Sequence, residues 1–257
     1  MKVGSGAWTL TGTNSFPGIM QVQSGQVFVN GSMPSTIASF INGALLGGSG
    51  TVGPIGFNRG TLAPGNNGPG ILNINSGGVA LNTNDTFSVV INGTSAGSGY
   101  SQLNVIGTVG LGNANLDLIM PVIGTTNWQL TIVNNDGADA VTGTFTNLPE
   151  GATITASNGA TFTISYHGGT GNDVVLTQTT LPPPALITGI THLGGGCMQL
   201  DGTGMANLTY TVWANTNLTT TNWLDIGPAT ASSAGGLQFT DLAATNFPMR
   251  FYRFSWP

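Results

Sequence analysis

Two stretches of this sequence share one pattern: Met20-Gln-Val-Gln-Ser-Gly-Gln-Val-Phe-Val-Asn30 and Leu72-Asn-Ile-Asn-Ser-Gly-Gly-Val-Ala-Leu-Asn82. In both, apolar and polar residues alternate on either side of a Ser-Gly pair, and an Asn closes the segment. Such alternation buries one face of a strand and exposes the other. Each stretch therefore predicts two short strands with a turn at Ser-Gly. A weaker version runs from Leu103 to Leu118, with Gly107 near the turn.

Short strand pairs that recur at long intervals indicate the coils of a β-solenoid, in which each coil covers the apolar face of its neighbour. Because the repeat is irregular, a sandwich stays open as an alternative for this region. Helical periodicity is almost absent. Only Ser35–Leu46 spaces its apolar residues as a helix would, and Gly43 interrupts that stretch. We therefore expect an all-β chain with at most one short helix or turn in that stretch.

A run of prolines, Leu181-Pro-Pro-Pro-Ala185, marks a boundary because consecutive prolines favour a stiff, extended spacer. We predict a solenoid domain over residues 1–180, a linker over 181–185 and a small β-sandwich over 186–257. Aromatic residues and arginines become more frequent in the last region. Its six expected strands are Leu186–Leu193, Cys197–Asp201, Leu208–Ala214, Trp223–Ile226, Leu237–Asp241 and Met249–Ser255.

Charged residues make up only 5% of the 257 residues, against an ordinary usage of about 25%. The four cations, Lys2, Arg59, Arg250 and Arg253, cannot neutralise a run of phosphates, so we expect no nucleic-acid partner. No apolar run reaches the roughly 20 residues that span a bilayer, so we expect no membrane insertion. The first residues contain no apolar core of a signal peptide. If the protein is exported, we expect its signal to lie outside this chain.

A family resemblance begins near the N-terminus. The segment Gly6-Ala-Trp-Thr-Leu-Thr-Gly-Thr-Asn-Ser-Phe-Pro-Gly18, followed by Val22-Gln-Ser-Gly-Gln-Val-Phe-Val29, resembles the autotransporter-associated β-strand repeat. That repeat usually reads Gly-x-Leu-x-Leu-x-Gly-x-Asn-x-Tyr-x-Gly and then Val-x-x-Gly-x-Leu-x-Val. Here Trp8 and Phe16 replace the first Leu and the Tyr. Further passenger-like runs extend the resemblance over residues 4 to 178, and the C-terminal region looks like a small terminal module of similar surface proteins.

The resemblance implies a right-handed β-helix on the outside of a Gram-negative cell, in adhesin-like proteins. We therefore expect a secreted, non-catalytic structural protein of the extracellular bacterial surface. Its expected partners are copies of itself, in extracellular assemblies or fibres, or neighbouring repeats of a larger surface protein. Two alternatives stay open. One is a carbohydrate-binding protein that uses the C-terminal domain, and the other is a polysaccharide lyase or hydrolase that needs Arg59 beside a carboxylate on the solenoid.

The candidate glycan- or partner-binding residues are the aromatic side chains of the C-terminal domain. Exposed rings in one plane would stack on sugars. In the alternative interpretation these aromatic residues belong to the core, and the arginines of this region pair with Asp201, Asp225 or Asp241. The candidates are Trp213, Trp223, Tyr252 and Trp256.

One segment, Gly168-Gly-Thr-Gly-Asn-Asp-Val-Val175, fits the calcium nonapeptide pattern, with Asp173 as the acidic ligand. Such a calcium site needs neighbouring copies of the pattern, and this chain has one. A glycine turn that leads into a strand is the favoured interpretation, so we expect no cofactor and keep calcium as the alternative. The closest pair of acids, Asp136 and Asp139, lies in a turn-forming sequence, and we expect no catalytic residues.

The first predicted strand begins close to the N-terminus. An uncovered strand leaves N–H and C=O groups that can pair with a further strand, and proteins usually protect such edges with charged residues or a capping element. This sequence offers few charges near its start. We therefore predict a strand-addition edge at Ala7, Trp8, Thr9, Leu10 and Thr11.

Overall fold

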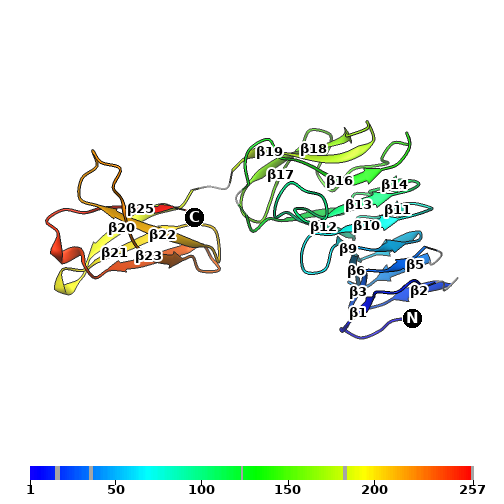
Figure 1. The fold of residues 1–257 in the computed structure, drawn as a ribbon. Helices are drawn as coiled ribbons and strands as arrows, with labels where there is room; N and C mark the ends of the chain where they lie inside the picture. The colour runs from blue at the N-terminus through cyan, green and yellow to red at the C-terminus, as the bar shows by residue number, and fades with distance from the viewer. Residues whose placement is uncertain (15–17, 35–36, 123, 182–183, 256–257) are drawn as a thin grey trace. The chain divides into compact units, whose positions relative to one another are not determined.

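The computed structural model describes residues 1–14, 18–34, 37–122, 124–181 and 184–255. The regular structure of the described residues consists almost entirely of strands, with no α-helix, which confirms the all-β prediction. The chain divides into two compact units, Met1–Leu181 and Pro182–Pro257, called unit 1 and unit 2 below (Figure 1). None of the described segments is a helix of the length and apolar character that crossing a membrane requires.

Unit 1 contains three sheets. The six-stranded sheet consists, in spatial order, of β1 (Ala7–Leu10), β3 (Gln26–Val29), β6 (Leu45–Gly48), β9 (Thr61–Pro64), β12 (Thr86–Val90) and β15 (Asn115–Ile119). The five-stranded sheet consists of β14 (Val109–Gly110), β11 (Val79–Ala80), β8 (Ile55–Asn58), β5 (Ile37–Ile41) and β2 (Ile19–Val22). The eight-stranded sheet consists of β17 (Thr153–Thr155), β18 (Thr161–Gly168), β19 (Asp173–Thr180), β16 (Gln129–Asn135), β13 (Gln102–Val105), β10 (Ile71–Ile74), β7 (Thr51–Val52) and β4 (Ser32–Met33).

From β2 to β16 the chain visits the five-, six- and eight-stranded sheets in constant rotation. Each visit adds one strand beside the strand of the preceding turn, and all these pairs are parallel because every turn runs in the same direction. Asn73, Asn104 and Asn134 occupy aligned positions on β10, β13 and β16. Their side-chain amides hydrogen-bond in a ladder, with distances of 2.9 and 3.2 Å between successive residues. Neighbouring turns are thus joined by backbone and side-chain bonds.

The Ser-Gly stretches form strand, turn and strand, but their two strands do not pair with each other. Ser24 and Gly25 join the five-stranded sheet to the six-stranded one, whereas Ser76 and Gly77 join the eight-stranded sheet to the five-stranded one. Both glycines have positive φ, 76° and 72°, a region that glycine enters without strain. The repeated pattern therefore encodes a corner between two sheets. Its two copies lie at different corners, because they join different pairs of sheets.

Of the short helix or turn allowed over Ser35–Leu46, the structure has a turn, at Asn42 and Gly43, and no helix over residues 37–46; residues 35–36 lie outside the described part of the chain. The segment forms β5 and β6, which belong to different sheets. Asn42 and Gly43 adopt φ values of 56° and 84° at the corner between them. Apolar residues on either side of this corner enter the same core, and their spacing in sequence imitates that of a helix face.

The core of unit 1 lies between the three sheets. Alternate residues of each strand point inward, so Val27, Leu46 and Leu62 on neighbouring strands are all fully buried. Aromatic side chains continue the stacking: the ring centroids of Phe40 and Phe57 are 5.3 Å apart. Burial of apolar area at about 25 cal/mol per Å² stabilises the stack of turns.

The two ends of the stack of turns in unit 1 differ. At the C-terminal end, residues 142–157 cover the last turn: the N–H groups of Thr146 and Ser157 donate to the carbonyls of Ala114 and Leu118, at 2.9 Å each. At the N-terminal end, β1 is the outermost strand of its sheet, and among the described residues it pairs with β3 alone. Lys2 is buried there, and its Nζ donates to two backbone carbonyls at 2.9 Å.

Unit 2 consists of two three-stranded antiparallel sheets around a small core. One sheet has the order β20 (Leu186–His192), β21 (Met198–Thr203) and β24 (Gly236–Asp241). The other has the order β23 (Leu224–Thr230), β22 (Thr209–Asn215) and β25 (Phe251–Ser255). Each of these six strands lies where the sequence predicted one. Their shared core includes Leu200, Val212 and Leu237.

Replacing the buried Asp85 by Ala should destabilise unit 1 strongly. The carboxylate is fully buried and accepts the N–H groups of Gly60 and Asn82, at 2.9 and 2.8 Å. Without it, both donors lose their partner, which costs about 1–3 kcal/mol each. Urea unfolding should show a loss of about 2–5 kcal/mol for Asp85→Ala and a smaller loss for Asp85→Asn, which keeps one acceptor. Asp139→Ala, at an exposed side chain, is the control; equal losses in both Ala variants would contradict the assignment.

Candidate functional site

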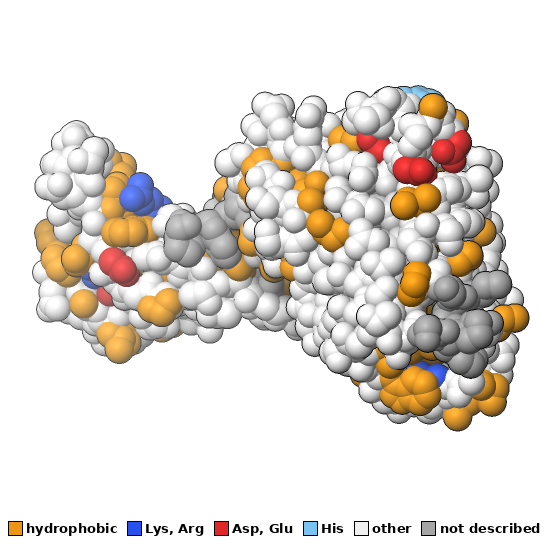
Figure 2. Space-filling model, turned by 45° about the vertical axis from the view of Figure 1, so that its right-hand side comes forward, with side chains coloured by type: hydrophobic (Ala, Val, Ile, Leu, Met, Phe, Trp, Pro, Cys, Tyr) orange, Lys and Arg blue, Asp and Glu red, His pale blue; other side chains and the backbone are white. Residues whose placement is uncertain are grey.

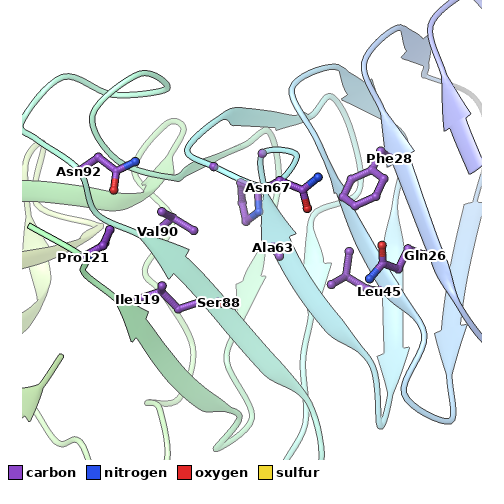
Figure 3. A pocket seen from close by; sticks show the side chains of 13 residues that line it. Gln26, Phe28, Leu45, Ala63, Asn67, Ser88, Val90, Asn92, Ile119 and Pro121 are labelled. Atoms are coloured by element: carbon purple, nitrogen blue, oxygen red, sulfur yellow. The ribbon is translucent and has the colours of Figure 1, made fainter. Parts of the chain in front are cut away.

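A groove with a volume of about 470 Å³ crosses the outer face of the six-stranded sheet in unit 1 (Figure 3). Its floor consists of outward-facing residues on five successive strands, from β3 to β15. Because alternate residues of a strand share a face, Ser88 and Val90 point into the groove while Phe87 and Val89 enter the core. The lining residues are Gln26, Phe28, Leu45, Ala63, Pro64, Gly65, Asn67, Gly68, Ser88, Val90, Asn92, Ile119 and Pro121.

Backbone geometry fixes the wall of this groove at residues 65–68. Gly48 and Gly65 exchange two backbone hydrogen bonds, of 2.6 and 2.8 Å, which hold the loop against the end of β6. Gly65 has a φ of 115°, and a Cβ there would collide with the carbonyl of Gly68. Gly47 leaves room for the ring of Phe28, since a Cβ would lie 2.9 Å from the Phe28 Cδ1 atom. The glycines therefore allow the close approach of loop, strand and aromatic ring.

The groove lining carries amides, one hydroxyl and apolar side chains, and none of its residues is charged. The side chains of Gln26, Asn67 and Asn92 form no hydrogen bond within the part of the chain that the structure describes. Ser88 is the exception, because its hydroxyl donates to the carboxylate of Asp117 at 3.4 Å. This lining therefore offers hydrogen bonds and apolar contact to a ligand.

The groove was not among the sites predicted from the sequence, although the sequence holds a signal for it. A strand with one solvated face should alternate apolar and polar residues. Val27-Phe28-Val29 and Val89-Val90-Ile91 are instead apolar without interruption. The inward residues of these runs fill the core, and the additional apolar residues, Phe28 and Val90, line the groove.

The predicted aromatic residues of unit 2 do not form one row. Trp213 and Trp223 are half-buried, and the guanidinium of Arg253 lies 5.6 and 4.5 Å from their ring centroids. Trp213 also donates its indole N–H to the Ser255 hydroxyl at 2.6 Å. Tyr252 neighbours Arg253 on β25 and so faces the opposite side, toward the core. Trp256 lies outside the described residues.

Asp241 is the centre of a buried polar cluster in unit 2. One of its oxygens accepts from the guanidinium of Arg250 at 2.5 Å and from the hydroxyl of Tyr252 at 3.0 Å, and the other accepts the N–H of Ala243. Of the three carboxylates proposed as arginine partners, Asp241 is thus the partner of Arg250, which also stacks on Phe247 at 4.3 Å. Burial, and then the adjacent Asp241, raise the pKa of Tyr252 to about 12.

Asp173, the candidate calcium ligand, is buried and has hydrogen-bond donors of the protein at both oxygens. One oxygen accepts the N–H of Asn135 at 2.8 Å, and the other accepts the N–H of Thr170 at 2.9 Å. The carboxylate therefore joins the glycine turn before β19 to the end of β16. Over the described ranges, no three His, Cys, Asp or Glu side chains come together as a group that could hold a metal ion.

Arg59, which the lyase alternative requires, lies exposed at the turn between β8 and β9, with a φ of 62°. Within the described ranges, the one ion pair present joins Arg250 and Asp241, so Arg59 has no carboxylate partner there. Asp136 and Asp139 are in a different turn, where Asp136 accepts the N–H of Gly107 at 2.8 Å. The structure does not bring these residues together with Arg59 in the groove lining.

The predicted edge forms strand β1 over Ala7–Leu10, and Thr11 follows the strand. Trp8 is 49% exposed, and the Nζ of Lys2 lies 5.8 Å from its ring centroid. Hydrophobic side chains gather at this end of unit 1 (Figure 2). Around Trp8 lies a cavity of about 220 Å³, lined by Met1, Trp8, Leu10, Asn14, Ile19, Met20 and Met33.

The sequence was compared with protein-family models and with curated proteins. No family model matches the sequence. No curated protein matches it at a significant level.

The pKa of Tyr252 predicts a loss of stability in unit 2 at alkaline pH. The folded state keeps the phenol protonated to about pH 12, whereas an unfolded tyrosine ionises near pH 10. The stabilisation is therefore fully present below about pH 10 and is lost as the pH rises toward about 12. Urea unfolding followed by tryptophan fluorescence should show this loss in the wild type and a weaker pH dependence in Tyr252→Phe. The same slope in both proteins would refute the assignment.

Proposed function

We propose that this chain is a non-catalytic, adhesin-like structural protein of the bacterial cell surface, in which unit 1 is a right-handed β-helix. The rotation of the chain through three sheets supports this fold, because every turn adds one parallel strand to each sheet. The resemblance of residues 4–178 to autotransporter-associated repeats supports the location outside the cell. Unit 2 would be the terminal module of such a protein.

The observation that carries the structural role is the unbroken bonding between successive turns. Strands β3, β6, β9, β12 and β15 are joined in register, and the ladder of Asn73, Asn104 and Asn134 joins the last three of these turns through side chains. Hydrogen bonds that run along the stack suit a stiff spacer, since stretching it would break many bonds together. The carboxylates of Asp85 and Asp173 also accept hydrogen bonds from backbone N–H groups, so they serve the structure.

A carbohydrate-binding role for unit 2 is the second candidate. Trp213 and Trp223 are half-buried on one face of the sheet that contains β22, so part of each ring is accessible. Loss of glycan binding in a Trp223→Ala variant would favour this candidate, while unchanged binding would argue against it.

Surface labelling of intact cells tests the proposed function. In an organism that encodes the chain, antibodies against unit 2 should label unpermeabilised cells, and added protease should remove the label. Deletion of the gene should reduce attachment of the cells to surfaces. Label that appears only after permeabilisation would contradict the location, and efficient turnover of a polysaccharide or ester by the purified protein would contradict the non-catalytic role.

Self-association through β1 should give dimers that do not grow into fibres. The covered C-terminal end of the stack leaves β1 as the free edge of the six-stranded sheet, so two copies would join by their N-terminal ends. The carbonyl of Gly6 accepts the N–H of Gln26 at the start of β3, and the carbonyl of Leu10 accepts the N–H of Asn30 directly after β3. Alternate residues therefore bond to β3, and the N–H and C=O groups of Ala7 and Thr9 point away from it.

A substitution at Thr9 tests this association with little disturbance of the β1–β3 pair. Thr9→Pro removes an outward N–H group, whereas Thr9→Ala keeps it. Sedimentation over a wide concentration range should show a dimer for the wild type and Thr9→Ala and a monomer for Thr9→Pro. A wild type that stays monomeric throughout, or one that forms ever larger species, would refute the proposed mode of association.

A further inference from the structure

We propose that the groove on the six-stranded sheet binds a stretch of a neutral polysaccharide. This site is separate from the aromatic residues of unit 2. The proposal goes beyond the structural role and does not depend on where the protein is located.

The dimensions of the groove favour an extended ligand. Its lining comes from five successive parallel strands, β3, β6, β9, β12 and β15. Neighbouring strands lie about 4.8 Å apart, so the floor is roughly 19 Å long. A compact metabolite would contact only part of this floor, whereas a chain molecule lying across the strands would meet side chains from every turn (Figure 3).

The chemistry of the lining favours an uncharged, hydroxyl-rich ligand. Amides of Gln26, Asn67 and Asn92 can donate to and accept from hydroxyl groups. The apolar side chains of Val90, which is half-buried, and Ile119, which is exposed, offer surface to the C–H faces of a sugar ring. No cation lines the groove, so a phosphate or carboxylate would lose water there without gaining an opposite charge.

The carboxylate of Asp117 sharpens this preference. It lies 3.4 Å from the hydroxyl of Ser88, which lines the groove, and its side chain is exposed. A negative charge at the margin repels anionic polymers such as polyuronides, and its oxygens can accept hydrogen bonds from neutral hydroxyls. The site should therefore discriminate between neutral and acidic glycans.

A peptide is the other extended ligand to consider, and the position of the groove disfavours it. Extended peptides are commonly bound at a sheet edge, where unpaired N–H and C=O groups continue the sheet. Within the groove floor, β6, β9 and β12 each pair with a strand on both sides, so their backbones are already bonded. Only side chains face the ligand, and the amides and hydroxyl among them match hydroxyl groups.

The groove is also largely formed before any ligand arrives. The paired backbones of Gly48 and Gly65 hold its wall, and the sheet holds its floor. Binding then costs little ordering of the protein, which favours affinity.

Calorimetric titration of the intact chain tests the proposal with defined probes. These are hexasaccharides of glucose, xylose and mannose as neutral ligands, an oligogalacturonide as the acidic counterpart, and an extended uncharged peptide. We expect at least one neutral hexasaccharide to bind and the acidic and peptide probes to bind at least about tenfold more weakly, a difference of about 1.4 kcal/mol.

Three variants locate the site. Gln26→Ala combined with Asn92→Ala removes two exposed amides and should weaken binding about tenfold or more. Val90→Trp should fill the groove and abolish binding, with circular dichroism confirming the fold. Gln129→Ala, at an exposed glutamine of the eight-stranded sheet, is the matched control and should bind as the wild type does.

Several results would overturn the proposal. They are absence of binding by all neutral probes, equal or tighter binding of the oligogalacturonide or the peptide, and binding that survives both groove variants. Binding lost in Trp223→Ala but kept in Val90→Trp would move the site to unit 2. Each of these readouts uses purified protein, so the cell-labelling result for the proposed function is independent of them.

Discussion

Parallel pairing between strands one turn apart is the interaction on which the rest of unit 1 depends. A strand such as β6 bonds to β3 and β9, which lie on neighbouring turns, and not to β5 or β7, which adjoin it in sequence. Each turn alone would expose its apolar face, and only stacking buries it. The same pairing aligns outward residues across turns, so that Phe28, Gly47 and Ala63 form one continuous line over the sheet. The groove is a consequence of that alignment.

A stack of turns also has two ends, and in unit 1 the two ends are covered by different means. The antiparallel strands β17, β18 and β19 continue the eight-stranded sheet beyond the last parallel strand, and the segment before them covers the neighbouring edges. At the other end, the cation of Lys2 satisfies carbonyls of the first turn. A buried ammonium is costly unless its donors are used. Gly25 makes this arrangement possible, because a Cβ there would collide with the Lys2 Nζ atom and lie 2.5 Å from the carbonyl oxygens of Gly4 and Gly6.

The alternation of apolar and polar residues was sufficient to predict strands, because that pattern is local. It located β22 and β24 almost to the residue. Pairing is not local, and so the sequence did not reveal that strands on either side of Ser24-Gly25 enter different sheets. For the same reason the spacing in Ser35–Leu46 did not distinguish a helix from a turn, since a corner brings apolar residues into one core at helix-like intervals. The groove as a whole could not be predicted from the sequence, because its residues are spread from Gln26 to Pro121 and come together only when the turns stack.

The two candidate carbohydrate surfaces differ in how much of their binding capacity the fold already uses. In unit 2, Arg253 covers part of Trp213 and Trp223, and the Trp213 N–H is bonded to Ser255. A sugar stacking there would have to displace or share a cation. In the groove, the amides of Gln26 and Asn92 have no partner among the described residues and are exposed. A ligand binds more favourably where the protein loses fewer of its own contacts on binding. This favours the groove over the aromatic face of unit 2.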